Sequence, residues 1–538
     1  MPADRLDDPD WVKKHLPFTG EVLMGHLRYG THGDNSIETV HPFLRQSNWI
    51  SRNLALAGNF NMTNVDELFD ELVSFGQYPK EHSDTVTVME KIGHFLDEEV
   101  QRLFDWFKSE GVDKQEINRL IFDHLDIQRV LRRATRKFDG GYVIAGMVGH
   151  GDAFILRDPS GIRPAFYYAD DEIVALASER PALQTALDVR WHQVRELGPG
   201  NALIVKHHGH VEEMPVLDPL PRNACSFERI YFSRGTDRDI YLERKMLGEK
   251  LIPQLVECIE HDFENTVFSF IPNTSEIAFF GLIQGLEREL NSLKKKALME
   301  QKDELDPEQI DAILNRHVRV EKLVNKDVKM RTFIADDLVR GDLVSHVYDV
   351  TYGIVRNEVD TLVLLDDSIV RGTTLRDSIL QIVSRLKPKK IIILSSAPQI
   401  RYPDCYGIDM SKMKEFAAFR ALVDLLEESG REQVLEDAYQ ECLRQQGAPP
   451  EELTNPLQDV YALFSYEEIS DRIARILTPA NIQIPVKIIY QTVEGLHESC
   501  PNNKGDWYFS GNYPTPGGTR VVQRAFMNYM EKKDVRAY

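Results

Sequence analysis

The sequence predicts two domains of different class, a mixed α+β domain followed by an α/β domain built on a parallel sheet. In the first 220 residues or so, short apolar segments recur between Gly, Pro and Asp turn signals, as expected of β-strands. After about Cys225, apolar runs alternate with long helical patterns, as expected of parallel strands joined by helices. Three prolines between Pro215 and Pro221 indicate the linker that separates the two domains.

The first domain, expected over residues 1–222, has its strands and helices in blocks, which is typical of a mixed domain. One helical stretch, from about Asp84 to Phe138, carries apolar residues at helix-like spacing. The segments expected to form strands lie at residues 20–30, 53–60, 140–149, 152–158, 164–170, 172–179 and 201–209.

The second domain is expected over residues 223–500, with residues 501–538 as a C-terminal tail. Helical insertions are expected at about 284–322 and 411–450, and the mixed charges of the first are typical of a solvated surface. The apolar runs that predict strands lie at residues 268–272, 361–367, 389–398 and 486–492.

One helix start can be predicted inside the first insertion. Asp306 fits an N-cap because Pro307 can take the first helical position. Gln309, three residues after Asp306, has the spacing of a capping box. We therefore expect a helix to begin at Pro307.

Composition and charge exclude several classes of function. Lys and Arg number 64 against 85 Asp and Glu, a net charge of −21 that disfavours nucleic acid and anionic membranes as partners. With 42% apolar residues, disorder of the whole chain is excluded. No apolar run approaches the roughly 18 residues of a membrane span, and the start lacks the apolar region of a signal peptide. Five Cys without a CxxC pair indicate a reducing compartment, so a cytoplasmic location is expected.

The most informative segment is Thr361–Thr374, TLVLLDDSIVRGTT. Its apolar half predicts a buried strand, and Asp366 and Asp367 follow at the carboxyl end, where open α/β sheets bind ligands. Two adjacent carboxylates suit polyol hydroxyls and a hard cation such as Mg²⁺. The turn after them can present N–H groups and hydroxyls to a phosphate, and Gly372 allows close approach. A helix cap followed by an ordinary turn is the simpler alternative.

The complete pattern resembles the phosphoribosyl pyrophosphate (PRPP) signature of type I phosphoribosyltransferases. The resemblance implies that Asp366 and Asp367 serve the ribose hydroxyls and Mg²⁺. It also implies that the following loop holds the 5′-phosphate of PRPP. The substrate-binding residues of that loop are then Ser368, Arg371, Gly372, Thr373 and Thr374.

Two further segments resemble this family in the expected order. Phe270–Ser275, FIPNTS, stands where amidophosphoribosyltransferases carry a Pro-Asp-Ser-Gly turn. Asn273 replaces the acid of that turn, whereas Thr274 keeps a hydroxyl for the metal or pyrophosphate. Lys329–Ile334, KMRTFI, is similar to the family's flexible catalytic loop, in which Arg331 is expected to neutralise pyrophosphate.

The first domain resembles class II glutamine amidotransferases. Cys225–Arg234 is similar to the junction between the two domains of glutamine PRPP amidotransferases, and the resemblance runs from about residue 17 to 410. It implies an Ntn-type αββα glutaminase-like sandwich followed by a type I phosphoribosyltransferase parallel-sheet domain. The matching segments of the first domain are Gly25–Gly33, Gly58–Asn64, Ser83–Thr85, Arg157–Pro164 and Ala177–Glu179.

The resemblance implies three residues of a glutamine site. Arg28 would bind the glutamine carboxylate, Asp84 its α-amine, and Asn59 would donate to the oxyanion during catalysis. The chemistry is suitable, because a guanidinium pairs with a carboxylate and a neutral amide stabilises a developing negative charge. Phe60 departs from the family, which has glycine after this Asn.

The glutaminase nucleophile of the family is absent from the chain. Enzymes of this fold use an N-terminal Cys whose own α-amine is the base. Here the first Cys is Cys225, and removal of Met1 would expose Pro2. Either the sequence is truncated at its start or the glutaminase is degenerate, and the retained glutamine-site residues favour truncation. The chain is expected to use ammonia and not glutamine.

Some family members carry an iron–sulfur cluster on four Cys. Cys225 and Cys405 match two of these positions, whereas Gly505 and Tyr508 stand at the other two. We expect no cluster, because two thiolates cannot close a four-Cys site. Mg²⁺ is the expected cofactor.

The resemblance implies an amidophosphoribosyltransferase, which replaces the pyrophosphate of Mg·PRPP by an amine in the first step of de novo purine synthesis. The expected partners are PRPP, glutamine or ammonia, purine nucleotides as feedback inhibitors, and further copies of the chain in a homo-oligomer. A non-catalytic PRPP- or nucleotide-binding regulator is the alternative, but it would not need the Lys329–Ile334 loop. A base-specific phosphoribosyltransferase would not need the first domain.

Overall fold

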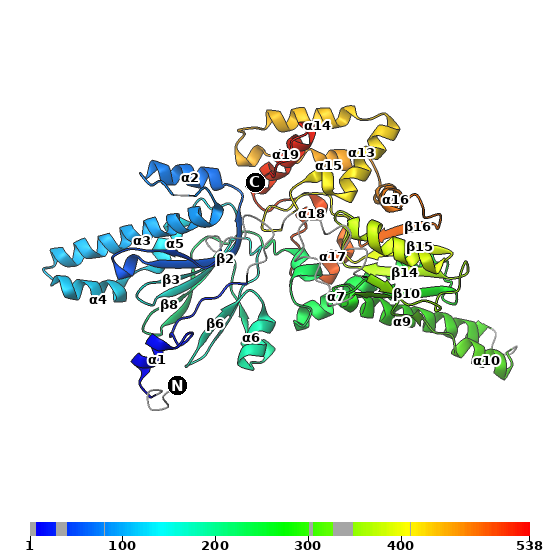
Figure 1. The fold of residues 1–538 in the computed structure, drawn as a ribbon, viewed down its shortest axis with the longest axis horizontal. Coiled ribbons are helices and arrows are strands. Elements are labelled where there is room, and N and C mark those ends of the chain that lie inside the picture. Colours follow the sequence, from blue (N-terminus) through cyan, green and yellow to red (C-terminus); the bar gives the residue numbers. More distant parts are fainter. Residues whose placement is uncertain are drawn as a thin grey trace. The chain divides into compact units, whose positions relative to one another are not determined.

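The computed structural model describes residues 7–27, 40–79, 81–300, 305–326, 348–408 and 410–537. The chain forms two compact units. The first is Met1–Arg222 with Cys405–Asp409, and the second is Asn223–Asp404 with Met410–Tyr538. Figure 1 shows the helices and strands of each unit. In the described ranges, no helix is both long enough and apolar enough to cross a membrane.

The first unit is built on a six-stranded antiparallel sheet with the strand order β1-β2-β3-β4-β8-β9. The long pairing of β2 with β3 forms its centre, and Asn59 lies opposite Val143 in that register. Leu54 and Leu56, at alternate positions of β2, are fully buried on the core side. The strands are β1 Phe43–Arg45, β2 Leu54–Met62, β3 Gly140–Val148, β4 Ala153–Arg157, β8 Asn201–Val205 and β9 Val211–Pro215.

Four helices cover one face of this sheet and share a hydrophobic core with it (Figure 1). Side-chain caps set three of the helix starts, because Ser83, Asp113 and Asp126 each accept a hydrogen bond from a first-turn N–H group. The predicted helical stretch therefore begins at Asp84 and consists of three helices. The four helices are α2 Val65–Ser74, α3 Asp84–Ser109, α4 Lys114–His124 and α5 Ile127–Ala134.

A three-stranded sheet with the order β6-β5-β7 covers the other face. Val143 and Ile155 of the large sheet pack against Tyr167 of the small one. On the outer side of the small sheet, Leu183 of α6 (Arg180–Leu187) packs against Phe166. The layers run helix, sheet, sheet, helix, which confirms the predicted mixed class. The strands are β5 Phe166–Ala169, β6 Val174–Ala177 and β7 Arg195–Glu196.

The first segment expected to form a strand does not do so in its described part. A short helix, α1 (Pro9–His15), is followed by an irregular stretch that includes residues 20–27. Leu23 and Leu27 are 64% and 95% exposed. An apolar segment becomes a strand only when a neighbouring strand pairs with it and covers it. Among the described strands, none pairs with this segment.

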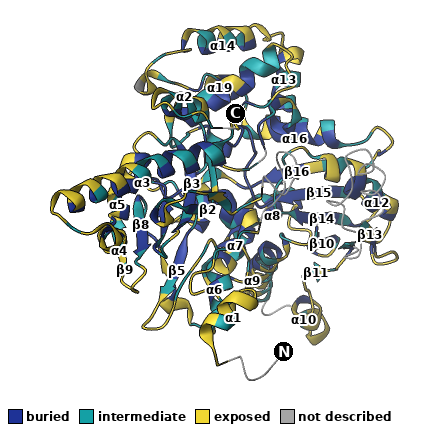
Figure 2. Cartoon of the chain, turned by 60° about the vertical axis from the view of Figure 1, so that its left-hand side comes forward, coloured by how far each residue is buried: buried dark blue, intermediate teal, exposed yellow. Residues whose placement is uncertain are grey.

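The second unit is built on a five-stranded parallel sheet with the order β11-β10-β14-β15-β16. Its inner strands β10, β14 and β15 appear buried in Figure 2. In the register, Leu365 lies opposite Phe270, and Ser395 lies opposite both Asp366 and Tyr490, so four strands end at a common edge. The strands are β10 Thr266–Phe270, β11 Arg319–Val320, β14 Thr361–Asp366, β15 Lys390–Ser395 and β16 Val486–Tyr490.

Helices α8 (Ile252–Cys258) and α9 (Glu276–Glu300) pack against this sheet, and α7 (Arg238–Lys250) packs against α9. Residues from α8 and α9 share a core with β10, β14 and β15. Because its first half is part of this core, α9 begins at Glu276 and not at the expected start near residue 284.

The first helical insertion also ends earlier than expected. The predicted helix start is confirmed, because α10 (Pro307–Leu314) has Asp306 as its N-cap and a capping box with Gln309. The stretch up to residue 322, however, is not helical throughout. Arg319 and Val320 form β11, where pairing with β10 satisfies the backbone of the sheet edge.

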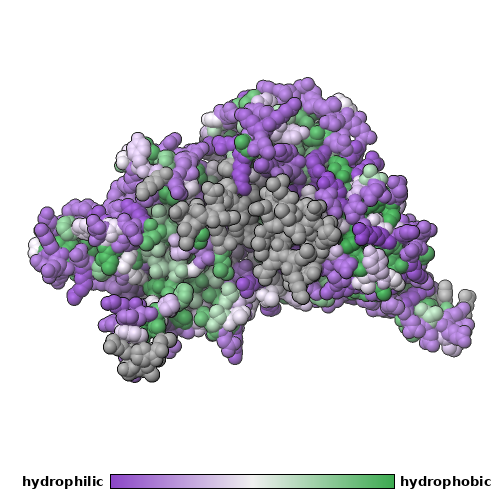
Figure 3. Space-filling view, in the orientation of Figure 1, coloured by the Kyte–Doolittle hydropathy of each residue, from purple (hydrophilic) through white to green (hydrophobic). Residues whose placement is uncertain are grey.

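In the second expected insertion, α13 (Ala417–Ser429) packs against α16, and α14 (Gln433–Arg444) packs against α15 and α19. The outer face of α14 is mainly hydrophilic (Figure 3). The residues after 500 are packed into this unit, since Phe526 is fully buried and its ring meets that of Phe419. The remaining helices are α15 Leu457–Tyr461, α16 Tyr466–Leu477, α17 Val493–Ser499, α18 Trp507–Ser510 and α19 Pro516–Met530.

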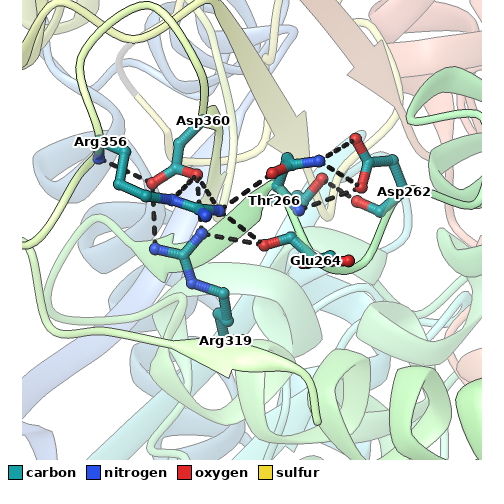
Figure 4. Close-up of polar contacts among 7 residues, drawn as sticks. Asp262, Glu264, Thr266, Arg319, Arg356 and Asp360 are labelled. Carbon is teal, nitrogen blue, oxygen red and sulfur yellow. Dashed lines mark hydrogen bonds and ion pairs between the residues drawn. The ribbon is translucent and has the colours of Figure 1, made fainter. Parts of the chain in front are cut away.

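A buried carboxylate holds the amino ends of the parallel strands together (Figure 4). Asp360 accepts hydrogen bonds from Arg319 at 2.7 and 3.0 Å and from Nη2 of Arg356 at 2.7 Å. Both guanidinium groups also donate to the carbonyl oxygen of Glu264, at 3.1 and 2.9 Å. Burial raises the pKa of Asp360, but the two guanidinium groups bring it down to about 2. This cluster ties β10, β11 and β14 at the end opposite to Asp366.

Candidate functional site

The acidic pair lies at the carboxyl edge of the parallel sheet. Asp366 is the last residue of β14, and Asp367 is the first residue after it. The N–H groups of Ser396 and Ala397 donate to the carbonyl oxygens of Asp366 and Asp367, each at 3.0 Å. The backbone that follows β15 therefore fixes the position of both acidic residues, whose side chains are half-buried.

Both carboxyl groups hold their protons more tightly than usual. Burial and the neighbouring charge of Asp367 raise the pKa of Asp366 well above its ordinary value. The pKa of Asp367 is raised to about 6, mainly by burial. The hydroxyl of Ser368, which donates to Oδ1 of Asp367 at 2.9 Å, lowers it in part. Two carboxylates that are partly desolvated at one strand end repel each other, so a cation or a pair of hydroxyl donors would stabilise their charged forms.

The loop after the acidic pair contains a glycine that its conformation and its packing require. Gly372 has a φ of +72°, a conformation that glycine adopts without steric cost. A Cβ at this position would lie 2.5 Å from Cδ1 of Leu477. Thr373 and Thr374 are exposed beside it and present two hydroxyls. The helical segment that follows consists of a π-helical turn Leu375–Ile379, α12 Leu380–Val383 and a 3₁₀ turn Ser384–Leu386.

The start of α13 anchors this loop from the outside. The guanidinium of Arg371 pairs with Glu415 at 2.6 Å. Arg420 donates to the carbonyl oxygen of Arg371 at 2.8 Å, and the N–H of Ala417 donates to that of Val370 at 2.9 Å. The loop is therefore held in shape by protein contacts, which is the preorganisation that an anion site requires.

Residues from two other elements contribute to the electrostatics of the acidic pair. Arg244 on α7 and Lys326 at the end of β12 (Val324–Lys326) both lower the pKa of Asp367. Tyr348, the first residue of β13 (Tyr348–Val350), has a pKa raised to about 12 by burial and then by the two Asp charges. Sequence reasoning missed Arg244 and Tyr348, because nothing in their local pattern marks a site.

The turn over Phe270–Ser275 leaves the same sheet edge as the acidic pair. The N–H of Ile271 donates to the carbonyl oxygen of Leu365 at 2.9 Å. Within the turn Asn273 is exposed and Thr274 is half-buried. The predicted metal or pyrophosphate residue Thr274 therefore lies on the loop of a strand directly adjacent to β14.

Two predicted site residues lie outside the described part of the chain. Arg331 belongs to residues 327–347, which connect β12 with β13. These two strands pair antiparallel, with Lys326 opposite Tyr348. Arg28 belongs to residues 28–39, which connect the irregular N-terminal stretch with the residues before β1.

The other two residues predicted for a glutamine site lie on elements that pack together in the first unit. Asn59 is exposed on β2, and Asp84 is the first residue of α3. Oδ1 of Asp84 accepts from the N–H of Thr85 at 2.6 Å. A Cβ on Gly58 would lie 2.6 Å from Cδ1 of Phe60, so the Phe60 ring folds back over the backbone beside Asn59.

A histidine pair that sequence reasoning missed adjoins this strand. The rings of His26 and His41 stack with their centroids 4.5 Å apart and an angle of 24° between planes. The N–H of Gly58 donates to Nδ1 of His41 at 3.2 Å. Two imidazoles therefore lie beside the strand that carries Asn59. His26 and His41 belong to no common helix or strand pattern, so the sequence alone could not indicate that their rings meet.

Cys225 lies against Gly505 and Tyr508, the two residues that the sequence resemblance aligns with cluster positions. It forms a parallel β-bridge with Gly505. Its Sγ lies 3.2 Å from the hydroxyl oxygen of Tyr508. Neither the Gly505 nor the Tyr508 side chain offers a thiolate to iron.

The comparisons with known proteins agree on one family. No protein-family model matches the chain. The amidophosphoribosyltransferase of Pasteurella multocida is 29% identical over 421 residues, covering 76% of this chain and 72% of that protein. The amidophosphoribosyltransferase of Archaeoglobus fulgidus is 28% identical over 425 residues, covering 77% of this chain and 75% of that protein. The chain is a relative of the amidophosphoribosyltransferases.

Two solved structures show the same fold. The glutamine PRPP amidotransferase of Bacillus subtilis, complexed with ADP and GMP, matches with a TM-score of 0.59 at 22% identity, covering 91% of this chain and 82% of that one. The allosteric regulatory enzyme of purine biosynthesis matches with the same TM-score, covering 81% of its chain. The predicted fold class, an Ntn-type sandwich followed by a type I phosphoribosyltransferase domain, is confirmed.

Proposed function

We propose that the chain forms 5-phosphoribosylamine from PRPP, as an amidophosphoribosyltransferase. The observation that carries this proposal is the acidic pair at the carboxyl end of β14, followed directly by the Gly372 loop. Carboxylates and an anion-binding loop at one strand end fit a sugar that carries both vicinal hydroxyls and a phosphate. The similarity of both units to amidophosphoribosyltransferases supports the reaction class.

Each part of the site would meet a different part of PRPP. Asp366 and Asp367 accept hydrogen bonds from the ribose hydroxyls, and the loop of Ser368–Thr374 binds the 5′-phosphate. Thr274 lies on the neighbouring turn and faces the pyrophosphate, with Arg331 as its cationic partner. Departure of pyrophosphate leaves positive charge at C1, and the nitrogen donor bonds to that carbon with loss of one proton to solvent. Catalysis is then positioning and charge neutralisation.

The residues present fit Mg²⁺. The raised pKa values of Asp366 and Asp367 show that their charged forms lack a sufficient counter-charge, and oxygen ligands are those that Mg²⁺ prefers. The hydroxyl of Thr274 would complete the protein's share of the ligands. When bound with PRPP at these residues, Mg²⁺ would supply counter-charge to the pyrophosphate.

Ammonia is the nitrogen donor that this sequence supports. All five Cys lie at position 225 or later, so residues 1–224 offer no thiol to attack the glutamine amide. Asn59 and Asp84 keep residue types suited to binding glutamine, but binding without a nucleophile leaves the amide intact. Free ammonia needs no such step.

A PRPP-binding regulator without catalysis is the second candidate. It is supported by the same loop, and it differs from the enzyme in releasing no pyrophosphate.

Purine nucleotides as inhibitors, a homo-oligomer and a cytoplasmic location complete the proposal. The Bacillus subtilis structure, which contains ADP and GMP, supports nucleotides as ligands of this fold.

The test is pyrophosphate release from Mg·PRPP with ammonium chloride as donor. The wild-type chain should turn over, and Asp366→Asn and Asp367→Asn should each lower the rate by about 100-fold or more, as expected for loss of transition-state electrostatics. Asp377→Asn is the matched control, because Asp377 is an exposed acid just beyond the loop that pairs only locally with Arg376 at 2.6 Å.

The two candidates give different results in the same assay. Binding of Mg·PRPP by calorimetry without pyrophosphate release would favour the regulator. Equal rates in the wild type and in both Asn variants, with unchanged circular dichroism, would contradict the assignment of the site.

A further inference from the structure

The first unit contains a cluster of two imidazoles and a carboxylate that the proposed reaction does not use. His150 and Asp152 lie in the turn between β3 and β4, and His207 lies in the turn between β8 and β9. The two turns are neighbours, because β4 pairs with β8 and Ala153 lies opposite Val205. One ligand atom from each of the three residues lies within 4.8 Å of the other two.

The carboxylate lies between the two rings. Nε2 of His150 is 3.1 Å from Oδ2 of Asp152, and Nδ1 of His207 is 3.1 Å from Oδ1. The side chains of His150 and Asp152 are both 0% exposed. Neither ring nitrogen of His150 makes a well-directed hydrogen bond, although the ring is completely buried. With its proton on Nδ1, the imidazole of His150 would present the lone pair of Nε2 at the centre of the cluster.

Outer groups orient the ligands. Nε2 of His207 lies 3.2 Å from the carboxylate of Asp123, at the end of α4. A proton held there leaves Nδ1 with its lone pair toward Asp152, which is the carboxylate–histidine arrangement of metal sites. The backbone N–H of His207 donates to Oδ1 of Asp152 at 2.8 Å. The ring of His150 stacks on the ring of Phe122, with 4.7 Å between the ring centroids.

We propose that His150, Asp152 and His207 bind a divalent transition-metal cation of the Zn²⁺ type. Two imidazole nitrogens and one carboxylate oxygen are a ligand set that Zn²⁺ takes in tetrahedral sites, with a fourth position left for water. Mg²⁺ is disfavoured, because it prefers oxygen ligands in octahedral geometry. The bound cation would join two turns of the large sheet to the end of α4.

Lys206 is the competitor for this cation. Its Nζ pairs with Oδ2 of Asp152 and also donates to the carbonyl oxygens of Leu125 and Phe122, at 3.0 and 3.3 Å. The ammonium group of Lys206 therefore keeps two carbonyl acceptors even when its contact with the Asp152 carboxylate is lost. A metal at the cluster would take over the role of Lys206 as counter-charge to Asp152, so removal of the lysine charge should strengthen metal binding.

The test is a Zn²⁺ titration of the chelator-washed full chain by competition with a chromophoric chelator. His207→Gln should weaken binding by about tenfold or more, and Asp123→Asn by about tenfold, in line with first and outer ligands of known sites. Lys206→Met should tighten binding. His210→Gln is the matched control, because His210 lies in the same turn but contacts Glu212, at 3.4 Å. Zn²⁺, and not Mg²⁺, should raise the melting temperature of the wild type.

The variants remain informative if one folds poorly. The His207 side chain is 25% exposed, so its Gln variant should keep the wild-type circular dichroism, and Asp123→Asn gives an independent second measurement. Substitution with Co²⁺ adds a spectroscopic control, since a thiolate charge-transfer band would place the metal at a Cys. That band, or equal Zn²⁺ affinity in the wild type and in His207→Gln, or an equal loss in His210→Gln, would overturn the proposal.

Discussion

The backbone N–H of Asp367 donates a hydrogen bond to Oδ1 of Asp366 at 2.9 Å, so one residue of the acidic pair orients the carboxylate of the other. The two carboxyl groups therefore lie at the same strand end and are shielded from water together. Their raised pKa values follow from this shared burial. The pair is stabilised as a unit when ligand or metal arrives, and destabilised as a unit when it is charged and unliganded.

The acidic pair should make the ligand-free chain less stable as pH rises from about 4 to about 6. In the unfolded chain Asp367 ionises near 3.8, whereas in the folded chain it keeps its proton up to about 6. Its contribution is therefore fully present below the lower value and is lost as pH rises through the upper one, by up to about 3 kcal/mol. Thermal unfolding across this range should show the decline in the wild type and a smaller one in Asp367→Asn. Identical pH slopes would contradict it.

A methyl group at Gly372 should damage PRPP binding and not only stability. Gly372 and Gly430 have φ values of +72° and +64°, so an alanine at either costs about 1 kcal/mol of backbone strain. Only at Gly372 would the new Cβ also clash, with Leu477 at 2.5 Å, whereas Gly430 has no neighbour within 4 Å. Gly372→Ala should raise KM for PRPP several-fold and Gly430→Ala should leave it unchanged. Equal KM values in both variants would show that the loop does not need this conformation.

The Asp360 cluster should stabilise the second unit above pH 4. The pKa of Asp360 is lowered to about 2 from an ordinary 3.8, so its contribution is present above the higher value and is lost as pH falls through the lower one. Asp360→Asn should lower the free energy of unfolding at pH 7 by about 2 kcal/mol, since two guanidinium groups lose their counter-charge. Asp311→Asn, an exposed acid on α10, should change it by less than about 0.5 kcal/mol. Urea unfolding of both variants measures the difference.

Local features of the fold could be predicted from the sequence because they are contiguous. The strand, the acidic pair and the Gly372 turn occupy one run of the chain, and the capping box of Asp306 needs only four residues. The start of α3 at Asp84 likewise follows from Ser83 as its cap. In each case the physical cause lies within a few residues of its effect.

The rest of the site depends on residues that the fold brings together. Arg244 and Tyr348 act on Asp367 from α7 and β13, which are distant in sequence. His207 meets Asp152 across 55 positions, through the pairing of β4 with β8. The error at residues 20–27 has the same origin, because strand formation requires a partner that local pattern cannot supply.

The nitrogen donor is the most direct test of the account. PRPP-dependent pyrophosphate release should be assayed on the full chain with ammonium chloride and, separately, with glutamine, each with Mg²⁺. We expect turnover with ammonium chloride at alkaline pH, where free ammonia is abundant. The rate with glutamine should be lower by several orders of magnitude, because no thiol lies in residues 1–224. Equal rates with both donors, or no pyrophosphate from either, would contradict it.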